Sequence, residues 1–192
     1  YLTSIANMSV LAPKNLWELR QDLEFAVTYN GPIAVRYPRG EAYRGLKEFD
    51  SPVEYGKGEM LYEEDGIALL AVGSMVSTAE HVRQKLKALG YHCTLANGRF
   101  IKPFDTDLVD RLAKNHKIVV TLEENVLQGG YGLKITSYIH TKYPDVKVLN
   151  IALPDTYVEH GNVSLLREGL KIDSDSVLQT LKEQYLDTLT EN

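Results

Sequence analysis

Two arginines directly follow a short apolar run and are the residues best placed for chemistry. Ile33-Ala34-Val35 leads straight into the sequence R-Y-P-R-G, which contains Arg36 and Arg39. In open α/β sheets, ligands bind just beyond the carboxyl ends of the strands. Two guanidinium groups at such a place could hold a phosphate or a carboxylate through paired hydrogen bonds. The alternative is a structural role, in which the arginines pair with nearby acids such as Glu41 or Glu48.

A second candidate combines acidic residues with glycines. Glu123-Glu124-Asn125 ends an apolar run, and G-G-Y-G at 129–132 follows. Glycines allow close backbone approach and a helix N-terminus attracts anions, but two adjacent carboxylates would oppose an anion. The spacing also matches neither the G-x-G-x-x-G dinucleotide pattern nor the P-loop pattern. We therefore expect tight packing of a helix end, against a neighbouring subunit, rather than a ligand site.

The histidines and the cysteine offer no complete catalytic or metal-binding set. The five histidines show no metal-type spacing and are expected at the surface or at helix ends; they are His81, His92, His116, His140 and His160. Only His160 falls in a loop after a predicted strand, so it alone could lie near a site. Cys93 lies in an apolar run, where an inert thiol is expected. The residues therefore predict a possible anion site, with no catalytic, metal-binding or cofactor-binding residue assigned.

These candidates require a framework, and the hydrophobic pattern supplies one. Apolar runs alternate with amphipathic stretches, which is typical of a mostly parallel sheet covered by helices on both faces. Right-handed crossovers then predict a doubly wound α/β domain. The expected strands are 67–73, 91–96, 117–122 and 146–151, and the expected helices are 78–89, 105–115, 129–143, 164–169 and 174–186.

The first fifty residues predict a strand, a helix and a strand that are too few for a core of their own. Asn15 and Glu18 have capping-box spacing, and apolar residues then recur at helical intervals; these are Leu16, Leu19, Leu23, Ala26 and Val27. We therefore divide the chain into 1–50, the tail of a second α/β domain, 51–66, a linker and lead-in, and 67–192, the main domain. Apolar surface left exposed on 1–50 is expected to cause association or fraying.

Composition limits the classes of partner and the location. The net charge of −5, with basic residues scattered along the chain, argues against nucleic acid or an anionic membrane as the main partner. No apolar run approaches the roughly 20 residues that span a bilayer. A single cysteine excludes an intrachain disulfide, which suggests a reducing, cytoplasmic setting. The chain begins with Tyr1 rather than Met, so we expect that its natural N-terminus is missing.

The motifs, taken in order, resemble one family. They are I-A-N-M at 5–8 with A-P-K at 12–14, G-P-I-A-V-R-Y-P-R-G at 31–40, A-V-G-S-M-V at 71–76, N-G-R-F-I-K-P at 97–103, E-E-N at 123–125 with G-G-Y-G at 129–132, and L-P-D at 153–155 with E-H-G at 159–161. This order is similar to the C-terminal part of the 1-deoxyxylulose-5-phosphate synthases, within the transketolase superfamily. One departure is A-N-G-R at 96–99, where that family more often has N-A-R.

The resemblance implies an activity for the full-length protein. Such an enzyme joins pyruvate to glyceraldehyde 3-phosphate with loss of carbon dioxide, with thiamine diphosphate and Mg²⁺ as cofactors, and its product feeds isoprenoid, thiamine and pyridoxal synthesis. The family's diphosphate site, its cofactor-activating glutamate and its substrate-facing histidine all lie upstream of Tyr1. This chain alone is therefore expected to be inactive and to bind no cofactor.

The resemblance also implies roles within the chain. By position, Arg39 resembles the arginine that holds the phosphate of the aldehyde substrate, with Arg36 as second choice. The family's C-terminal domain contributes mainly to dimer contacts, so a homodimer is expected. The alternative is the assembly domain of another member of the superfamily, a transketolase or a 2-oxoacid dehydrogenase β subunit, in which the arginines are structural.

Overall fold

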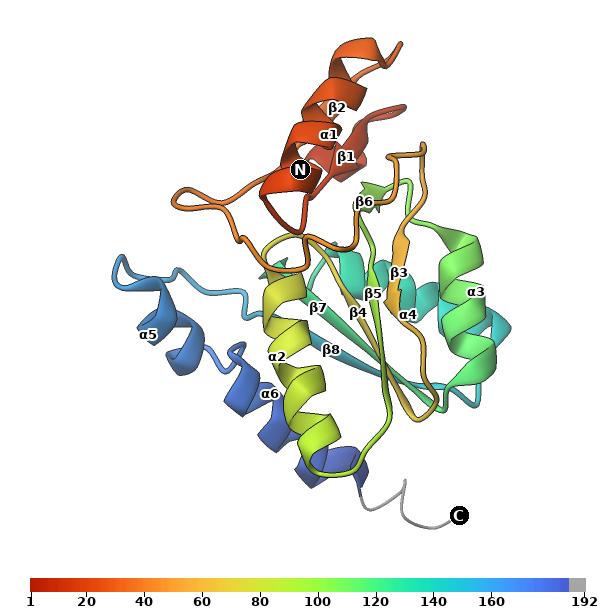
Figure 1. Cartoon of the computed structure of the whole chain (residues 1–192), viewed down its shortest axis with the longest axis vertical. Helices are drawn as coiled ribbons and strands as arrows, with labels where there is room; N and C mark the ends of the chain where they lie inside the picture. Colours follow the sequence, from red (N-terminus) through yellow and green to blue (C-terminus); the bar gives the residue numbers. More distant parts are fainter. Residues whose placement is uncertain (187–192) are drawn as a thin grey trace.

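The main sheet of the protein has five strands and is mostly parallel. A computed structural model describes residues 1–186 and places the strands in the order β3-β5-β4-β7-β8 (Figure 1). Their bounds are Glu59–Tyr62 for β3, Ile67–Ala71 for β4, Cys93–Asn97 for β5, Ile118–Val126 for β7 and Lys147–Leu153 for β8. Strands β5, β4, β7 and β8 are parallel, and only β3 pairs antiparallel, at the edge beside β5.

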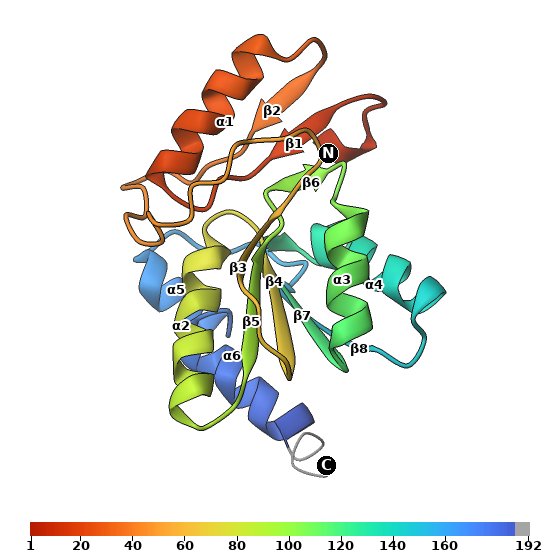
Figure 2. The ribbon, with the colours of Figure 1, turned by 45° about the vertical axis from the view of Figure 1, so that its right-hand side comes forward.

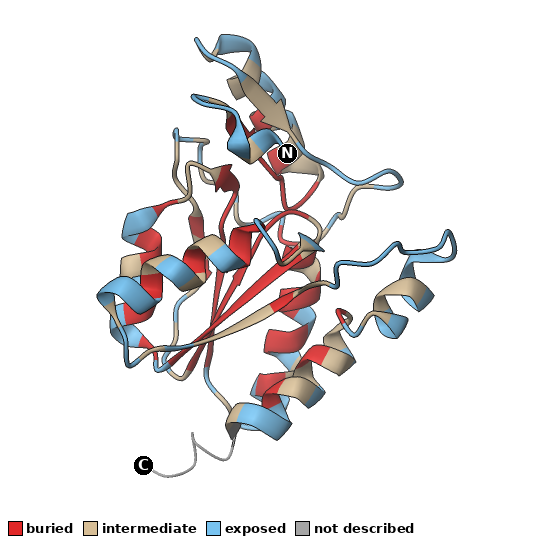
Figure 3. Ribbon diagram, turned by 180° about the vertical axis from the view of Figure 1, so that it is seen from behind, coloured by how far each residue is buried: buried red, intermediate tan, exposed pale blue. Residues whose placement is uncertain are grey.

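Helices cover both faces of this sheet, which confirms the predicted doubly wound α/β fold. Helices α2 (Met75–Ala88) and α6 (Ser174–Leu181) pack into the core on one face. Helices α3 (Thr106–Asn115) and α4 (Tyr131–Lys142) pack on the other (Figure 2). Every residue of the central strand β4 is buried, as expected for a parallel strand covered on both faces (Figure 3). Short elements complete the fold: η1 (Leu2–Ser4), α5 (Val163–Gly169) and a single π-helical turn, η2 (Lys182–Leu186).

Helix α3 starts after a side-chain cap, whereas α2 does not. The carboxylate of Asp105 accepts hydrogen bonds from the backbone of Asp107 and Leu108 and so caps α3. Helix α2 begins at Met75, three residues before the predicted start. The hydroxyl of Ser77 donates to the carbonyl of Ser74, so Ser77 lies inside the first turn of α2.

A second, three-stranded sheet joins residues 1–50 to the main domain. Strand β1 (Ser9–Leu11) lies between β2 (Ile33–Val35), which is parallel to it, and β6 (Phe100–Lys102), which is antiparallel. Strand β6 belongs to the later part of the chain, so this small sheet is shared across the predicted division. Strand β3 similarly lies within the 51–66 lead-in and forms the edge of the main sheet.

Helix α1 (Leu16–Thr28) is capped by Asn15 as predicted, but its buried side is polar. Glu18 and Asp22 are buried, whereas Leu23 and Val27 are 47% and 87% exposed. Part of the apolar spacing of this segment therefore marks the side that faces away from the main domain. The helix contacts the main domain through buried charges and through the edge-on packing of Phe25 against Phe100 of β6.

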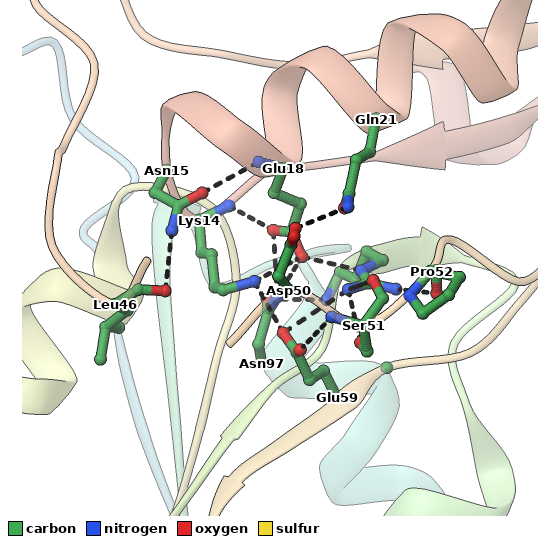
Figure 4. A network of polar contacts seen from close by, with 12 residues as sticks. Lys14, Asn15, Glu18, Gln21, Leu46, Asp50, Ser51, Pro52, Glu59 and Asn97 are labelled. Carbon is green, nitrogen blue, oxygen red and sulfur yellow. Dashed lines mark hydrogen bonds and ion pairs between the residues drawn. The ribbon is translucent and has the colours of Figure 1, made fainter. Parts of the chain in front are cut away.

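Those charges form a buried network around Glu18 (Figure 4). The Glu18 carboxylate accepts from Lys14 Nζ at 3.0 Å, Arg99 Nε at 2.8 Å and Asn97 Nδ2 at 2.8 Å. Lys14 Nζ also lies 2.6 Å from Glu59 Oε2, and Arg99 Nη2 lies 3.5 Å from the same oxygen. Two buried cations thus balance two buried anions. Lys14 precedes α1, Glu18 lies in α1, Glu59 lies in β3 and Arg99 follows β5.

Asp22 lies beside this network without a hydrogen-bond partner for either carboxylate oxygen within residues 1–186. Burial, followed by the nearby charge of Glu18, raises the pKa of Asp22 from 3.8 to about 8. The carboxyl is therefore protonated in the folded protein at neutral pH. A neutral Asp22 preserves the charge balance of the network.

We expect Arg99→Met to destabilise the fold by about 3–5 kcal/mol, because two carboxylates would lose a buried cation. Arg111→Met is a matched control, since Arg111 forms an exposed pair with Glu63 and should change stability by about 1 kcal/mol or less. Urea unfolding of both variants measures the difference. Equal effects of the two substitutions would show that the buried network does not stabilise the fold.

We expect Asp22→Asn to stabilise the protein increasingly as pH rises from about 4 to 8. The folded-state pKa of Asp22 is raised, so over this range only the unfolded chain releases the proton, and unfolding becomes easier. Asparagine resembles the neutral carboxyl and removes this loss. Denaturant unfolding at several pH values, with the exposed Asp145→Asn as control, measures it. A gain that does not grow with pH would contradict a protonated Asp22.

Candidate functional site

Arg36 lies at the carboxyl end of β2 and is held by the last part of β7. Its Nη2 donates to the backbone carbonyl of Glu124. The charge of Arg36 also favours the ionised forms of the Glu123 and Glu124 carboxylates. Arg36 is therefore engaged by the E-E-N segment through this hydrogen bond.

Arg39 lies further along the same loop and lines a cavity of about 600 Å³. The walls come from the loop after β2, the first residues of α1, the start of α2 and helix α5. Arg39 is exposed and forms no ion pair with any residue in the range 1–186. Neither arginine pairs with Glu41 or Glu48 in this part of the chain, so the predicted structural alternative for Arg39 finds no support in the geometry.

A smaller cavity of about 280 Å³ adjoins the larger one. Arg36, Ser74 and Glu124 line it at the ends of β4 and β7, and Tyr37 and Pro38 line both cavities. The carboxyl ends of parallel strands meet at one edge of a sheet, which is where ligands bind in such folds. The structure thus brings both predicted arginines to this edge, with Arg39 in the more open position.

Glu124 connects three elements around these cavities. Its Oε2 accepts from the hydroxyl of Ser74, at the start of α2, and from Nη2 of Arg167, on α5, at 2.7 Å. Burial opposes ionisation of Glu124, but the hydrogen bonds from Arg167 and Ser74 outweigh it and hold the pKa below its usual value. Glu124 is therefore an anion that fixes α5 to the edge of the sheet.

Glu123, next to it, serves a different purpose. Its carboxylate accepts from the backbone of Tyr131 at 2.9 Å and of Gly132 at 2.7 Å, so it occupies the N-terminus of α4. A Cβ at Gly132 would lie 2.5 Å from Thr121 Oγ1 and 2.6 Å from Asn150 Oδ1. The glycines therefore permit tight packing of a helix end, here against the chain's own strands, and no external anion has access to this terminus.

No hydrogen bond or ion pair among residues 1–186 links His160 to Arg36 or Arg39. It is exposed in the loop between β8 and α5. Cys93 is a free, buried cysteine, and burial raises the pKa of its thiol to about 12, so it is inert as predicted.

Sequence reasoning missed Arg167 and the linking role of Glu124. Arg167 lies in a short helix more than a hundred residues from Arg39 in the sequence. No local sequence pattern predicts its contact with Glu124. The pairing becomes visible only when β7 and α5 meet in the fold.

The resemblance places the metal and diphosphate site upstream of Tyr1, and the residues of 1–186 do not form a second one. No three His, Cys, Asp or Glu side chains gather as metal ligands would within 1–186. The one glycine-rich helix start, at α4, is already occupied by Glu123. This part of the chain therefore offers no site for thiamine diphosphate and Mg²⁺.

We expect Gly132→Ala to destabilise the protein by about 1–3 kcal/mol, because the new methyl group would overlap Thr121 and Asn150. Gly169→Ala is the matched control: it lies in helix α5 with no atom within 4 Å of the added Cβ, and should be neutral or slightly stabilising. Thermal unfolding compares them. Equal melting temperatures would show that the α4 start is not tightly packed.

The comparisons with known proteins agree with this architecture. The family model for the transketolase C-terminal domain matches residues 56–177. A solved inactive β4 tetramer of a split-gene transketolase superposes with a TM-score of 0.89 at 24% identity, covering 99% of this chain and 61% of that one. Transketolase from Campylobacter jejuni gives a TM-score of 0.69 at 17% identity, over 95% of this chain and 27% of the other. At these identities the structures support the fold alone.

Curated relatives extend the similarity over nearly the whole chain. The 1-deoxy-D-xylulose-5-phosphate synthase of Lachnoclostridium phytofermentans is 43% identical over 96% of this chain and 30% of its own length. The synthase of Heliobacterium modesticaldum is 38% identical over 95% of this chain and 28% of its own length. The resemblance seen in the motifs is thus confirmed, although the chain spans only about 30% of the length of these relatives.

Within residues 1–186, none of the helices combines the length and the apolar character that a membrane span requires.

The matched domain contains the five-stranded sheet and the ends of β4 and β7 that form the candidate site. The chain therefore belongs to the transketolase C-terminal domain family.

Proposed function

We propose that this chain is the C-terminal part of a 1-deoxy-D-xylulose-5-phosphate synthase. The whole protein would condense pyruvate with glyceraldehyde 3-phosphate and release carbon dioxide, supplying precursors of isoprenoids, thiamine and pyridoxal. Support comes from relatives of that name at up to 43% identity over 96% of the chain. The single structural observation that carries the proposal is the unpaired Arg39 in a cavity at the strand ends.

In this proposal Arg39 binds the phosphate of the aldehyde substrate. A guanidinium without an acid partner retains all its donors for an anion, and it binds phosphate oxygens in a fixed geometry. Arg36 is the second choice for the phosphate-binding residue, because its Nη2 already donates a hydrogen bond to the Glu124 carbonyl. Its main role is to hold the loop that carries Arg39. His160 is not assigned a role.

The cofactors, partners and location belong to the same proposal. Thiamine diphosphate, which stabilises a substrate carbanion, and Mg²⁺ would bind to other parts of the full-length enzyme, so this chain alone would be inactive. Residues 1–50 would end the pyrimidine-binding domain, 51–66 would lead in, and 67–192 would form the C-terminal domain. The whole protein would be a cytoplasmic homodimer, as the resemblance implies.

A second candidate function is assembly within another enzyme of the superfamily. The self-capped start of α4 and the exposed Leu23 and Val27 favour a structural module with an apolar contact surface. Product analysis of the full-length protein separates the two functions. Only the synthase forms deoxyxylulose phosphate from pyruvate and the phosphorylated aldehyde.

We expect Arg39→Ala in the full-length protein to raise KM for glyceraldehyde 3-phosphate far more than KM for pyruvate. Loss of a charge-assisted contact of about 1.5–3 kcal/mol corresponds to a change of roughly 10- to 150-fold. Steady-state kinetics with each substrate varied in turn measures it, and Arg44→Ala, in the same loop region but outside the cavity lining, is the control. Equal changes in both KM values, or no change, would contradict the phosphate role.

A further inference from the structure

Helix α5 contributes a second guanidinium to the cavity that contains Arg39. Arg167 lines this cavity, although it lies in a different part of the chain. Helix α5 has seven residues and none of them is buried, so hydrophobic packing does little to hold it. Arg167 is fixed by its ion pair with Glu124, at 2.7 Å.

The donors of Arg167 are only partly used. Its Nη2 donates a hydrogen bond to the Glu124 carboxylate, whereas its Nε is buried and has no hydrogen-bond partner within residues 1–186. A buried donor without an acceptor costs free energy, and nearly all such groups in proteins find one. The Arg167 side chain is 22% exposed, so the part of it that a ligand in the cavity can reach lies on atoms other than the buried Nε. The guanidinium could then bridge Glu124 and the ligand.

The size and the charged lining of the cavity favour a small anion. Its volume of about 600 Å³ is typical of small-molecule sites. Three cationic residues, Lys14, Arg39 and Arg167, line it, against the one acid Glu41. Lys14 is fully engaged by the buried network, so Arg39 and Arg167 are the two cations left with donors for a ligand.

We propose that Arg167 binds the phosphate of the aldehyde substrate together with Arg39, so that the C-terminal domain takes part in substrate recognition. This inference rests on the proposed function. Two guanidiniums from separate elements would bind a phosphate group with greater selectivity over uncharged groups than one guanidinium, because the phosphate can accept hydrogen bonds from both at once. Arg167 would thus be a specificity residue that favours phosphorylated over unphosphorylated aldehydes.

The test is the ratio of kcat/KM for D-glyceraldehyde 3-phosphate to that for unphosphorylated D-glyceraldehyde in the full-length enzyme. We expect Arg167→Gln to lower this ratio at least tenfold, with KM for pyruvate within twofold of the unmodified enzyme. Arg39→Gln should lower it as well. A purely structural role of Arg167 would affect both aldehydes equally and leave the ratio unchanged.

Arg44→Gln is the matched control, because it removes an exposed arginine outside the cavity lining. We expect this variant to retain the ratio. If Arg39→Gln lowers the ratio and Arg167→Gln does not, the inference is wrong and the proposed function stands. If neither Arg39→Gln nor Arg167→Gln lowers the ratio, the proposed phosphate site is wrong too. Should Arg167→Gln not fold, Arg167→Lys keeps the charge but loses the planar fork, and the same drop in the ratio is expected.

Discussion

The burial of Glu18 is the constraint on which the arrangement of this protein depends. A carboxylate that is only 1% exposed is tolerated because Lys14, Asn97 and Arg99 surround it, and Glu59 balances the second cation. Such a network adds little net stability compared with an apolar core, but it is costly to break, so it fixes one relative placement of its members. Here the members come from α1 and the segment before it, from β3, and from β5 and the segment after it. Helix α1, and with it the strand end that carries Arg36 and Arg39, is thereby held against the main domain.

The edge of the sheet shows how two neighbouring carboxylates acquire different roles. Glu123 faces inward and caps α4, whereas Glu124 faces the cavities and holds Ser74 and Arg167. Both acids balance part of the positive charge of Arg36. Arg39 lies beyond their reach and retains its charge for a ligand. The difference between two arginines three residues apart therefore arises from tertiary contacts.

The sequence predicted the fold class well because parallel strands buried on both faces are continuous apolar runs, as in β4. It did not predict β6 or the antiparallel pairing of β3, whose short segments carry no periodic signal. It did not predict that Glu18 and Asp22 form the buried side of α1, because charges in a helix ordinarily predict exposure. Arg36 and Arg39 could be found from their position after a strand, whereas Arg167 required the fold.

The central claim is that the cavity beside Arg39 receives the phosphate of the substrate. The most direct measurement is a crystal structure of the full-length protein with glyceraldehyde 3-phosphate bound. The account predicts that phosphate oxygens lie within hydrogen-bond distance of the Arg39 guanidinium, inside the cavity bounded by α1, α2 and α5. A phosphate bound elsewhere, with Arg39 left in solvent, would contradict it.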